Sequence, residues 1–385
     1  MEDLSATNIS PAYFTKTLFL FKFVNKEDRA MIGERLQRAR KAADLSLRNL
    51  AEQVGVSHTW INKFEKDQAM PDSKTLLKLG KVLGVRSEYF FRPEQVTLSQ
   101  VEYHKKSTLP KKRLQAITHE ILDHIERRME LESLFPQPPV ETFRLPAGLP
   151  DRVESYSQIE EVANHTRREW DLGMNPIPAL IDLLEMKGIR VFCVDARNDA
   201  KFDGLFAYVE DAPIIVVGKY WPGDRQRFTL AHELGHLVLA NRLSENLDHE
   251  KAGNRFAGAF LFPDVSVKKY LGAKRSSLES REIQALKYEF ELSMFAIIRR
   301  AFDLEIIKES YYSSLAIHFR TKGWHKNEPG EQIKPENENI FCNLVFHALA
   351  EEYIGDSKAA ELLSLSLDNF RRYRSMEEIN AAPCQ

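Results

Sequence analysis

Two histidines and a glutamate within one predicted helix have the residue types and spacing of a chemical site. His232, Glu233 and His236 stand inside an apolar run that continues to Leu239. Four residues advance an α-helix by about 400 degrees, so the two imidazoles project about 40 degrees apart and can bind one metal ion. A hydrolytic zinc site needs three protein ligands and an open position for water, whose proton a neighbouring carboxylate can take. The pattern therefore predicts His232 and His236 as metal ligands and Glu233 as the catalytic base.

A third metal ligand must come from another element. The next predicted helix begins near Asp248, His249 and Glu250. We favour Glu250, because its spacing from Phe256 and Ala257 turns those apolar residues inward while the carboxylate faces the site. His249 is a rival on spacing alone, since it would give an equally competent three-histidine site. Zn²⁺ is the expected ion, with Mn²⁺ as the alternative.

A second histidine pair, His119 and His124, lies one residue too far apart for this geometry. Five residues turn a helix by about 500 degrees, which leaves the two imidazoles about 140 degrees out of register. We therefore interpret this pair, with Glu120, as part of the solvated face of a helix.

The elements around the predicted metal site have mixed periodicity. Residues 140–310 contain helical runs near 159–170, 224–241 and 248–262, and strand candidates at 189–194, 204–209 and 214–217. This pattern predicts an α+β domain with a small antiparallel or mixed sheet. Asp203 and Gly204 fit a turn into a strand better than a catalytic face. The sequence does not choose among four conceivable oxyanion stabilisers, which are Tyr208, Tyr220, Arg225 and Arg227.

A helix-turn-helix is predicted within residues 31–95, where five short helices alternate with polar turns. Ser46 and Ser57 are good helix N-caps, and Gly55 suits the tight turn between two crossed helices. The second of these helices turns polar side chains outward, where they can contact bases and phosphates of double-stranded DNA. The candidate DNA contacts are Arg48, Ser57, His58, Thr59, Asn62, Lys63 and Lys66. A helical bundle used for protein contact is the alternative.

The remaining segments are expected to connect or extend these domains. Residues 1–30 look like an extension, with Met31 as a candidate start. Residues 96–139 look like a linker that contains a long amphipathic helix at 110–135. This helix is a candidate dimerisation element. Residues 311–385 are expected to form a C-terminal region, with a flexible polar loop at 322–339 and then two or three small helices.

Composition limits the class of protein. The chain has 385 residues, 54 Lys plus Arg against 56 Asp plus Glu, and three cysteines. This balance excludes a polycation that wraps nucleic acid along its whole length, so DNA binding is confined to one module. The few scattered cysteines favour a cytoplasmic protein, and the early apolar stretch at 13–24 is too interrupted by charge for a membrane span.

Two segments of the sequence resemble known families. Residues 227–236, 250–257 and 261–263 resemble the ImmA/IrrE family of metallopeptidases, over a region of about 150–305. The resemblance implies a zincin-like fold with His232, His236 and Glu250 as zinc ligands and Glu233 as general base. Gly253 and Phe262 replace the usual Ala and Met, which puts packing in question. Residues 31–92 resemble Xre/Cro repressors, in which the positions of Arg40 and Glu65 commonly pair.

Together these features predict a multidomain DNA-binding regulator that is also a zinc-dependent endopeptidase. The resemblance implies cleavage of a repressor or antitoxin, in stress, mobile-element or toxin-antitoxin regulation. Xre-type modules usually bind two half-sites, so a homodimer is expected. The alternative is a non-proteolytic transcription factor or antitoxin whose metal site is structural or sensory.

Overall fold

The computed structural model describes residues 32–91, 98–103, 111–195, 204–209 and 212–377. The expectations for residues 1–30, Met31 and Asp203 lie outside these ranges. The chain divides into two compact units, the first ending at Pro93. Among the described residues, no helix has the length and apolar character needed to cross a bilayer.

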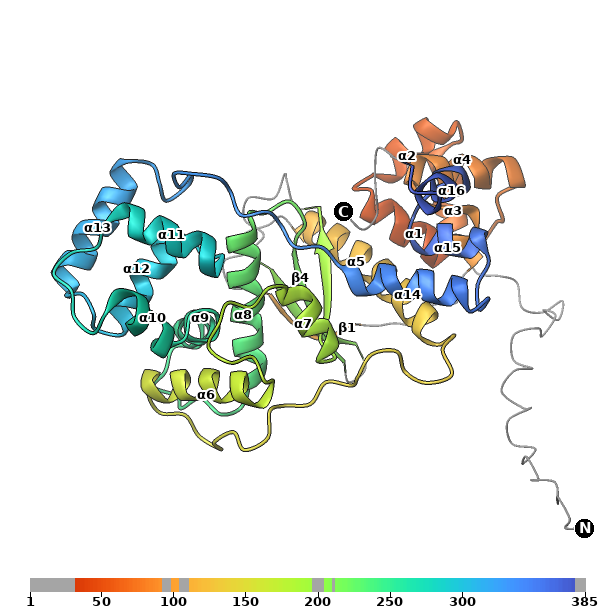
Figure 1. Cartoon of the computed structure of the whole chain (residues 1–385). Helices are drawn as coiled ribbons and strands as arrows, with labels where there is room; N and C mark the ends of the chain where they lie inside the picture. The colour runs from red at the N-terminus through yellow and green to blue at the C-terminus, as the bar shows by residue number, and fades with distance from the viewer. Residues whose placement is uncertain (1–31, 92–97, 104–110, 196–203, 210–211, 378–385) are drawn as a thin grey trace, which may run out of the picture. The chain divides into compact units, whose positions relative to one another are not determined.

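The described residues of the first unit form four α-helices and one 3-10 helix, as the five predicted short helices require; Figure 1 labels the α-helices. The five elements are α1 Gly33–Ala42, α2 Leu47–Val54, α3 His58–Glu65, α4 Ser73–Leu83 and η3 Ser87–Phe91. Ser46 accepts a hydrogen bond from the Asn49 N–H, and Ser57 accepts one from the Trp60 N–H, as expected for N-caps. Gly55 ends α2 in the left-handed conformation at φ 81° and so turns the chain into α3.

An ion pair joins the first and third helices of this unit. Arg40 Nε lies 2.5 Å from Glu65 Oε1, and Arg40 Nη2 donates to Glu65 Oε2 at 2.9 Å. The side chains are only 12% and 4% exposed, so the bidentate pair is largely desolvated. The predicted pairing of these two residues is confirmed.

The second unit is built on a four-stranded mixed sheet with the order β1-β3-β4-β2. Its strands are β1 Leu98–Tyr103, β2 Arg190–Val194, β3 Leu205–Val209 and β4 Ala212–Gly218. β2 and β4 are parallel, and the other two pairings are antiparallel. β4 is a continuous apolar run buried almost throughout, as expected of a central strand covered on both faces. Three strands lie close to their predicted positions, whereas β1 was not predicted.

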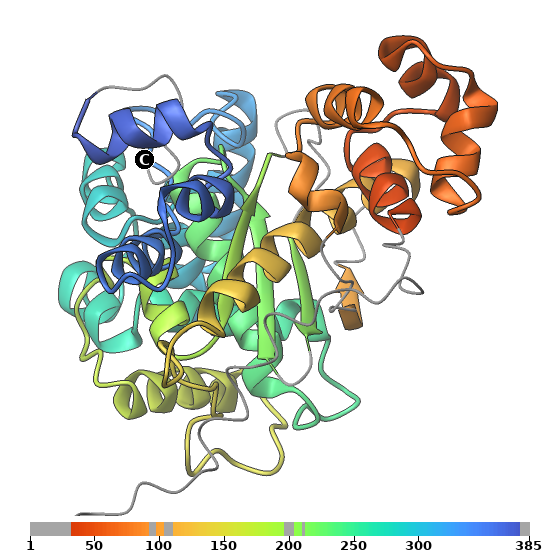
Figure 2. The same ribbon diagram turned by 90° about the vertical axis from the view of Figure 1, so that its right-hand side faces the viewer.

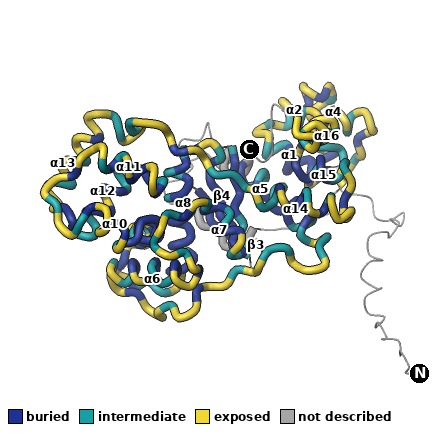
Figure 3. Tube along the Cα trace, viewed as in Figure 1, coloured by how far each residue is buried: buried dark blue, intermediate teal, exposed yellow. Residues whose placement is uncertain are grey.

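Helices cover this sheet and extend beyond it. The central ones are α6 Tyr156–Glu169, α7 Leu180–Met186, α8 Gly223–Leu239 and α9 His249–Leu261. Further along the chain follow α10 Asp264–Leu271, α11 Ser280–Phe290, α12 Met294–Asp303, α13 Glu309–Thr321, α14 Asn339–Ala350, α15 Asp356–Leu362 and α16 Leu367–Arg374. In Figure 3 the buried positions gather along α8 and β4, which mark the core of this unit.

The long helix expected in the linker is present as α5 Lys111–Glu132, and it packs within the second unit. It crosses one side of the sheet in Figure 2 and contacts β2, α14 and α15. Ile117, Ile121 and Ile125 are fully buried in these contacts. His124 lies against Phe192 of β2, with ring centroids 6.3 Å apart. The solvated-face interpretation is therefore wrong for His124, because sequence periodicity could not reveal that the sheet and the C-terminal helices cover this helix.

The polar segment at 322–339 is irregular, as expected for a loop, but it is held along much of its length. The carboxylate of Glu328 accepts hydrogen bonds from the Met294 and Phe295 N–H groups at the start of α12. The carbonyl of Ile333 accepts from the Gly223 N–H, and the Glu336 N–H donates to Gln226, both at the start of α8. We call residues 328–338 the strap, because hydrogen bonds of its backbone and of Glu328 tie it to two helices.

Candidate functional site

Helices α8 and α9 bring the three predicted ligands together. Nine residues separate the end of α8 from the start of α9, so the two helices form a pair that packs closely. α8 is buried on nearly every face because it lies between β4, α7 and α9. Asp248 caps α9 by accepting from the Lys251 N–H, which fixes the first turn of the helix that carries Glu250.

The donor atoms of His232, His236 and Glu250 all lie within 4.8 Å of one another. The two Nε2 atoms are 2.8 Å apart, and His232 Nε2 lies 3.8 Å from Glu250 Oε2. Such a cluster can converge on one divalent ion at bond lengths of about 2 Å. His249, the rival ligand, is exposed on the first turn of α9 and does not belong to the cluster.

Two neighbours on α9 orient the His232 imidazole. His232 Nδ1 lies 3.0 Å from Asn254 Oδ1, so the ring can donate there and leave Nε2 deprotonated toward the cluster. Gly253 lies directly under the ring: a Cβ at this position would stand 2.9 Å from His232 Cε1. The departure at Gly253 thus has a packing consequence, since an alanine would require the imidazole to move.

Glu233 is buried beside the ligands, with only 2% of its surface exposed. Gly204, just before β3, approaches it closely: a Cβ there would lie 3.4 Å from Glu233 Oε1 and 2.9 Å from Thr229 Cγ2. Gly204 also has a φ of 114°, which side-chain-bearing residues rarely adopt. Gly204 therefore leads into the strand, as expected, and it also borders the candidate base, which differs from the expectation of a turn residue alone.

Of the four conceivable oxyanion stabilisers, Arg227 is engaged in structural contacts. Its side chain is 1% exposed, and its guanidinium contacts Glu336 of the strap, Glu291 and the carbonyl of Ile177. Arg225 stacks on Trp221, with its Cζ 3.9 Å from the ring centroid, and stands about 10 Å along α8 from His232. Tyr220 is half exposed and precedes α8.

A buried ion-pair network behind the site was not predicted. Glu160 of α6 contacts Arg255 of α9 at 2.5 Å and Arg300 of α12 at 2.7 Å. Arg255 also contacts Asp303 at 3.1 Å, and Arg300 donates to the carbonyl of Phe262. Because these partners come from segments up to 140 residues apart, no local pattern indicates the network.

The candidate DNA contacts form an exposed face on α2 and α3. Ile61 and Phe64 are buried, and the opposite face of α3 is exposed or half-buried. The predicted contacts are exposed at Arg48, Ser57, His58, Thr59, Lys63 and Lys66, and half-buried at Asn62. Trp60 also lies on this face without having been predicted: it is 48% exposed, and Lys63 Nζ lies 5.0 Å from its ring centroid.

Comparisons with known proteins agree with this two-part organisation. A helix-turn-helix family model matches residues 36–90. A peptidase family model, described as the IrrE N-terminal-like domain, matches residues 185–302 and so includes all three clustered residues and Glu233. The chain joins a helix-turn-helix domain to an IrrE N-terminal-like domain. No solved structure matches it.

The curated relatives are HTH-type transcriptional regulators. The regulator YonR of the SPbeta prophage in Bacillus subtilis is 36% identical over 62 residues, or 16% of this chain and 57% of that protein. PuuR of Escherichia coli is 41% identical over 70 residues, or 18% and 38%. ImmR of Bacillus subtilis is 30% identical over 66 residues, or 17% and 52%. The chain thus covers about half or less of the length of these relatives.

Proposed function

We propose that this chain is a DNA-binding regulator whose IrrE N-terminal-like domain is a zinc-dependent endopeptidase. The observation that carries the proposal is the convergence of His232, His236 and Glu250 beside the buried carboxylate of Glu233. Imidazole and carboxylate donors suit Zn²⁺, and also Mn²⁺. The proposed substrate is a protein, an Xre-type repressor or antitoxin, in stress, mobile-element or toxin-antitoxin regulation.

Each residue has a role in this proposal. When bound, zinc supplies Lewis-acid polarisation of the scissile carbonyl. Glu233 takes the proton from the attacking water and returns it to the leaving amine. Asn254 keeps the His232 ring oriented, and Gly204 leaves space beside Glu233.

The direct test is cleavage of candidate substrates. The purified full chain is incubated with HTH-type regulators encoded beside it, and intact mass spectrometry reads the products. We expect two fragments that sum to one regulator plus one water, absent with EDTA and restored by Zn²⁺. Mass spectra that stay unchanged for every regulator, in the zinc-loaded chain, would contradict the peptidase proposal.

A non-proteolytic regulator with a structural or sensory metal site is the second candidate, because the curated relatives are all HTH-type regulators. It predicts DNA binding without any cleavage product. In either case we propose that the chain binds as a homodimer to two half-sites one helical turn apart. Sedimentation of the complex with a site selected from random DNA tests the dimer.

Removing Glu250 is expected to weaken zinc binding about 100-fold or more, because a ligand is lost outright rather than merely its orienting partner. The matched control is His249→Ala, one residue earlier on the same exposed turn, which should bind zinc like the wild type. Competition of both variants with a chromogenic chelator measures the affinities. Equal affinities for Glu250→Ala and His249→Ala would remove Glu250 from the ligand set.

Replacing Lys63 by alanine is expected to weaken DNA binding at all sequences, because this exposed lysine lies where the phosphate backbone would pass. The slope of log affinity against log salt should fall by about 0.9 for each Lys63 lost, or about 1.8 for the proposed homodimer, because fewer counterions are released. Lys81→Ala, an exposed lysine on α4, is the control. Fluorescence anisotropy over a salt series measures both, and identical slopes for the two variants would place Lys63 away from DNA.

A further inference from the structure

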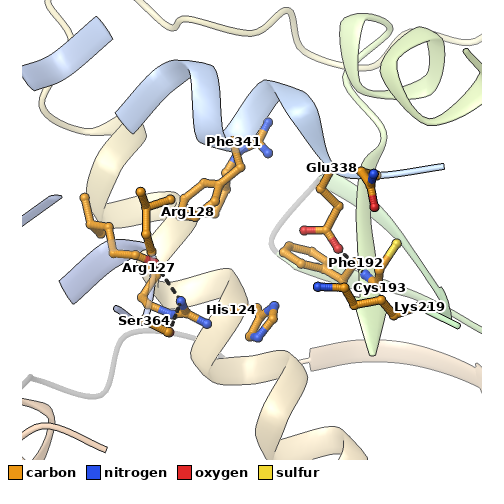
Figure 4. Close-up of a pocket in the computed structure, with 12 residues that line it drawn as sticks. His124, Arg127, Arg128, Phe192, Cys193, Lys219, Glu338, Phe341 and Ser364 are labelled. Atoms are coloured by element: carbon orange, nitrogen blue, oxygen red, sulfur yellow. Dashed lines mark hydrogen bonds between the residues drawn. The ribbon is translucent and has the colours of Figure 1, made fainter. Parts of the chain in front are cut away.

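We propose that a cavity between α5, the sheet and the strap binds a small organic anion, a carboxylate or a phosphate ester. We call it the α5 cavity (Figure 4). Its volume is about 200 Å³, and it lies wholly within the second unit. It is lined by His124, Arg127, Arg128, Phe192, Cys193, Lys219, Asn337, Glu338, Phe341, Leu362, Leu363 and Ser364. None of these residues belongs to the candidate metal site.

The lining of the cavity holds more basic than acidic side chains. Arg127, Arg128 and Lys219 line it, and Glu338 is the acidic residue that the described lining contains. Arg127 Nε also lies 3.2 Å from Asp123 Oδ2. Arg128 contacts Glu132 at 2.6 Å and Glu185 at 3.0 Å. Burial raises the pKa of Glu185 to about 7 despite Arg128, so at neutral pH Glu185 carries only part of a negative charge. Burial likewise raises the pKa of Glu338.

One buried donor of the cavity lacks a hydrogen-bond partner within the described residues. Arg128 is 2% exposed, yet its Nη2 is buried without a hydrogen bond within the described part of the chain. Lys219 is half-buried, and its Nζ makes no ion pair among the described residues; it lies 6.0 Å from the Tyr220 ring centroid. A buried donor such as Arg128 Nη2 is costly unless a partner satisfies it, and an anionic oxygen would do so.

The rest of the lining suits an organic rather than an inorganic anion. Phe192 and Phe341 form aromatic walls, and Leu362 and Leu363 add apolar surface. Burial and the nearby Arg127 lower the pKa of His124 to about 3, so its imidazole is neutral and can donate one hydrogen bond and accept another. Figure 4 shows the Lys219 and Glu338 side chains reaching from the sheet side toward α5, where His124 faces them.

The position of the cavity links its occupant to the helix that carries the two histidines. Lys219 stands four residues before α8, and Glu338 stands two residues after Glu336, which is tied to Arg227 of α8. Glu338 also accepts a hydrogen bond from the Cys193 N–H at the end of β2. An anion held by Lys219 and Arg127 would therefore bridge α5 and the connection into α8, beside the end of the strap.

Phenyl phosphate and benzoate are the probes, titrated into the full-length protein at constant ionic strength and followed by calorimetry. We expect saturable binding of at least one, and the stronger probe distinguishes phosphate from carboxylate chemistry. Lys219→Met should weaken that binding tenfold or more, whereas Lys219→Arg and the exposed-site control Lys322→Met should leave it within twofold. Far-UV circular dichroism establishes that each variant is folded.

Hydrogen exchange of the wild-type protein gives an independent readout that needs no variant. Bound probe should slow exchange at residues 219–226 and 333–338. Absence of saturable binding by both probes, equal binding by Lys219→Met and wild type, or unchanged exchange in both segments would overturn the proposal. Because binding is the readout, an inactive peptidase would not affect the outcome.

Discussion

Replacing Glu233 with glutamine is expected to lower the cleavage rate about 100- to 10,000-fold while zinc stays bound. Glutamine keeps the size of the side chain and the packing beside Gly204, but it cannot accept the proton of the attacking water. The three clustered donors are unchanged, so the metal affinity should match that of the wild type.

The measurement pairs two readouts on the same purified protein. Single-turnover cleavage of a regulator found to be a substrate gives the rate, and elemental analysis gives the zinc content. Glu245→Gln is the matched control, because this exposed glutamate lies between α8 and α9 outside the cluster. Wild-type cleavage by Glu233→Gln would assign the base to another group, and loss of zinc would assign Glu233 to the metal.

Glu160→Gln is expected to lower the free energy of unfolding of the second unit by about 3 kcal/mol or more. The carboxylate of Glu160 contacts both Arg255 and Arg300, and Arg300 is only 1% exposed. Removing the charge leaves two largely desolvated guanidinium groups with less compensation, which costs more than the original pair contributes. Arg255 keeps Asp303 as a carboxylate partner, so most of the destabilisation should come from Arg300.

Urea unfolding followed by tryptophan fluorescence measures this change. Glu161→Gln is the control, because the next residue on α6 is exposed and should shift stability by less than about 0.5 kcal/mol. A Glu160→Gln variant as stable as Glu161→Gln would mean that the network contributes nothing net. The network also joins α6 and α12 to α9, so we expect the same variant to loosen the helix that carries Glu250.

Local features of the sequence predicted much of the fold and of the candidate site. The spacing of His232 and His236 depends only on helical periodicity, and the caps at Ser46 and Ser57 depend on neighbours three residues away. The three strands β2, β3 and β4 were likewise predicted from local apolar runs. The Arg40–Glu65 pair was predicted by resemblance and is observed.

Contacts between distant segments needed the tertiary structure. Spacing left His249 and Glu250 as alternatives, and the packing of α9 on α8 brings Glu250 to the imidazoles. Periodicity marked His124 as surface, because it describes one helix at a time and cannot show which sheet or helix covers a face. Sequence periodicity also could not predict the contacts of Glu160, the strap or the α5 cavity. Each joins residues that lie far apart along the chain, so no local pattern marks it. Helical geometry thus determined which side chains share a face, and packing decided what each face meets.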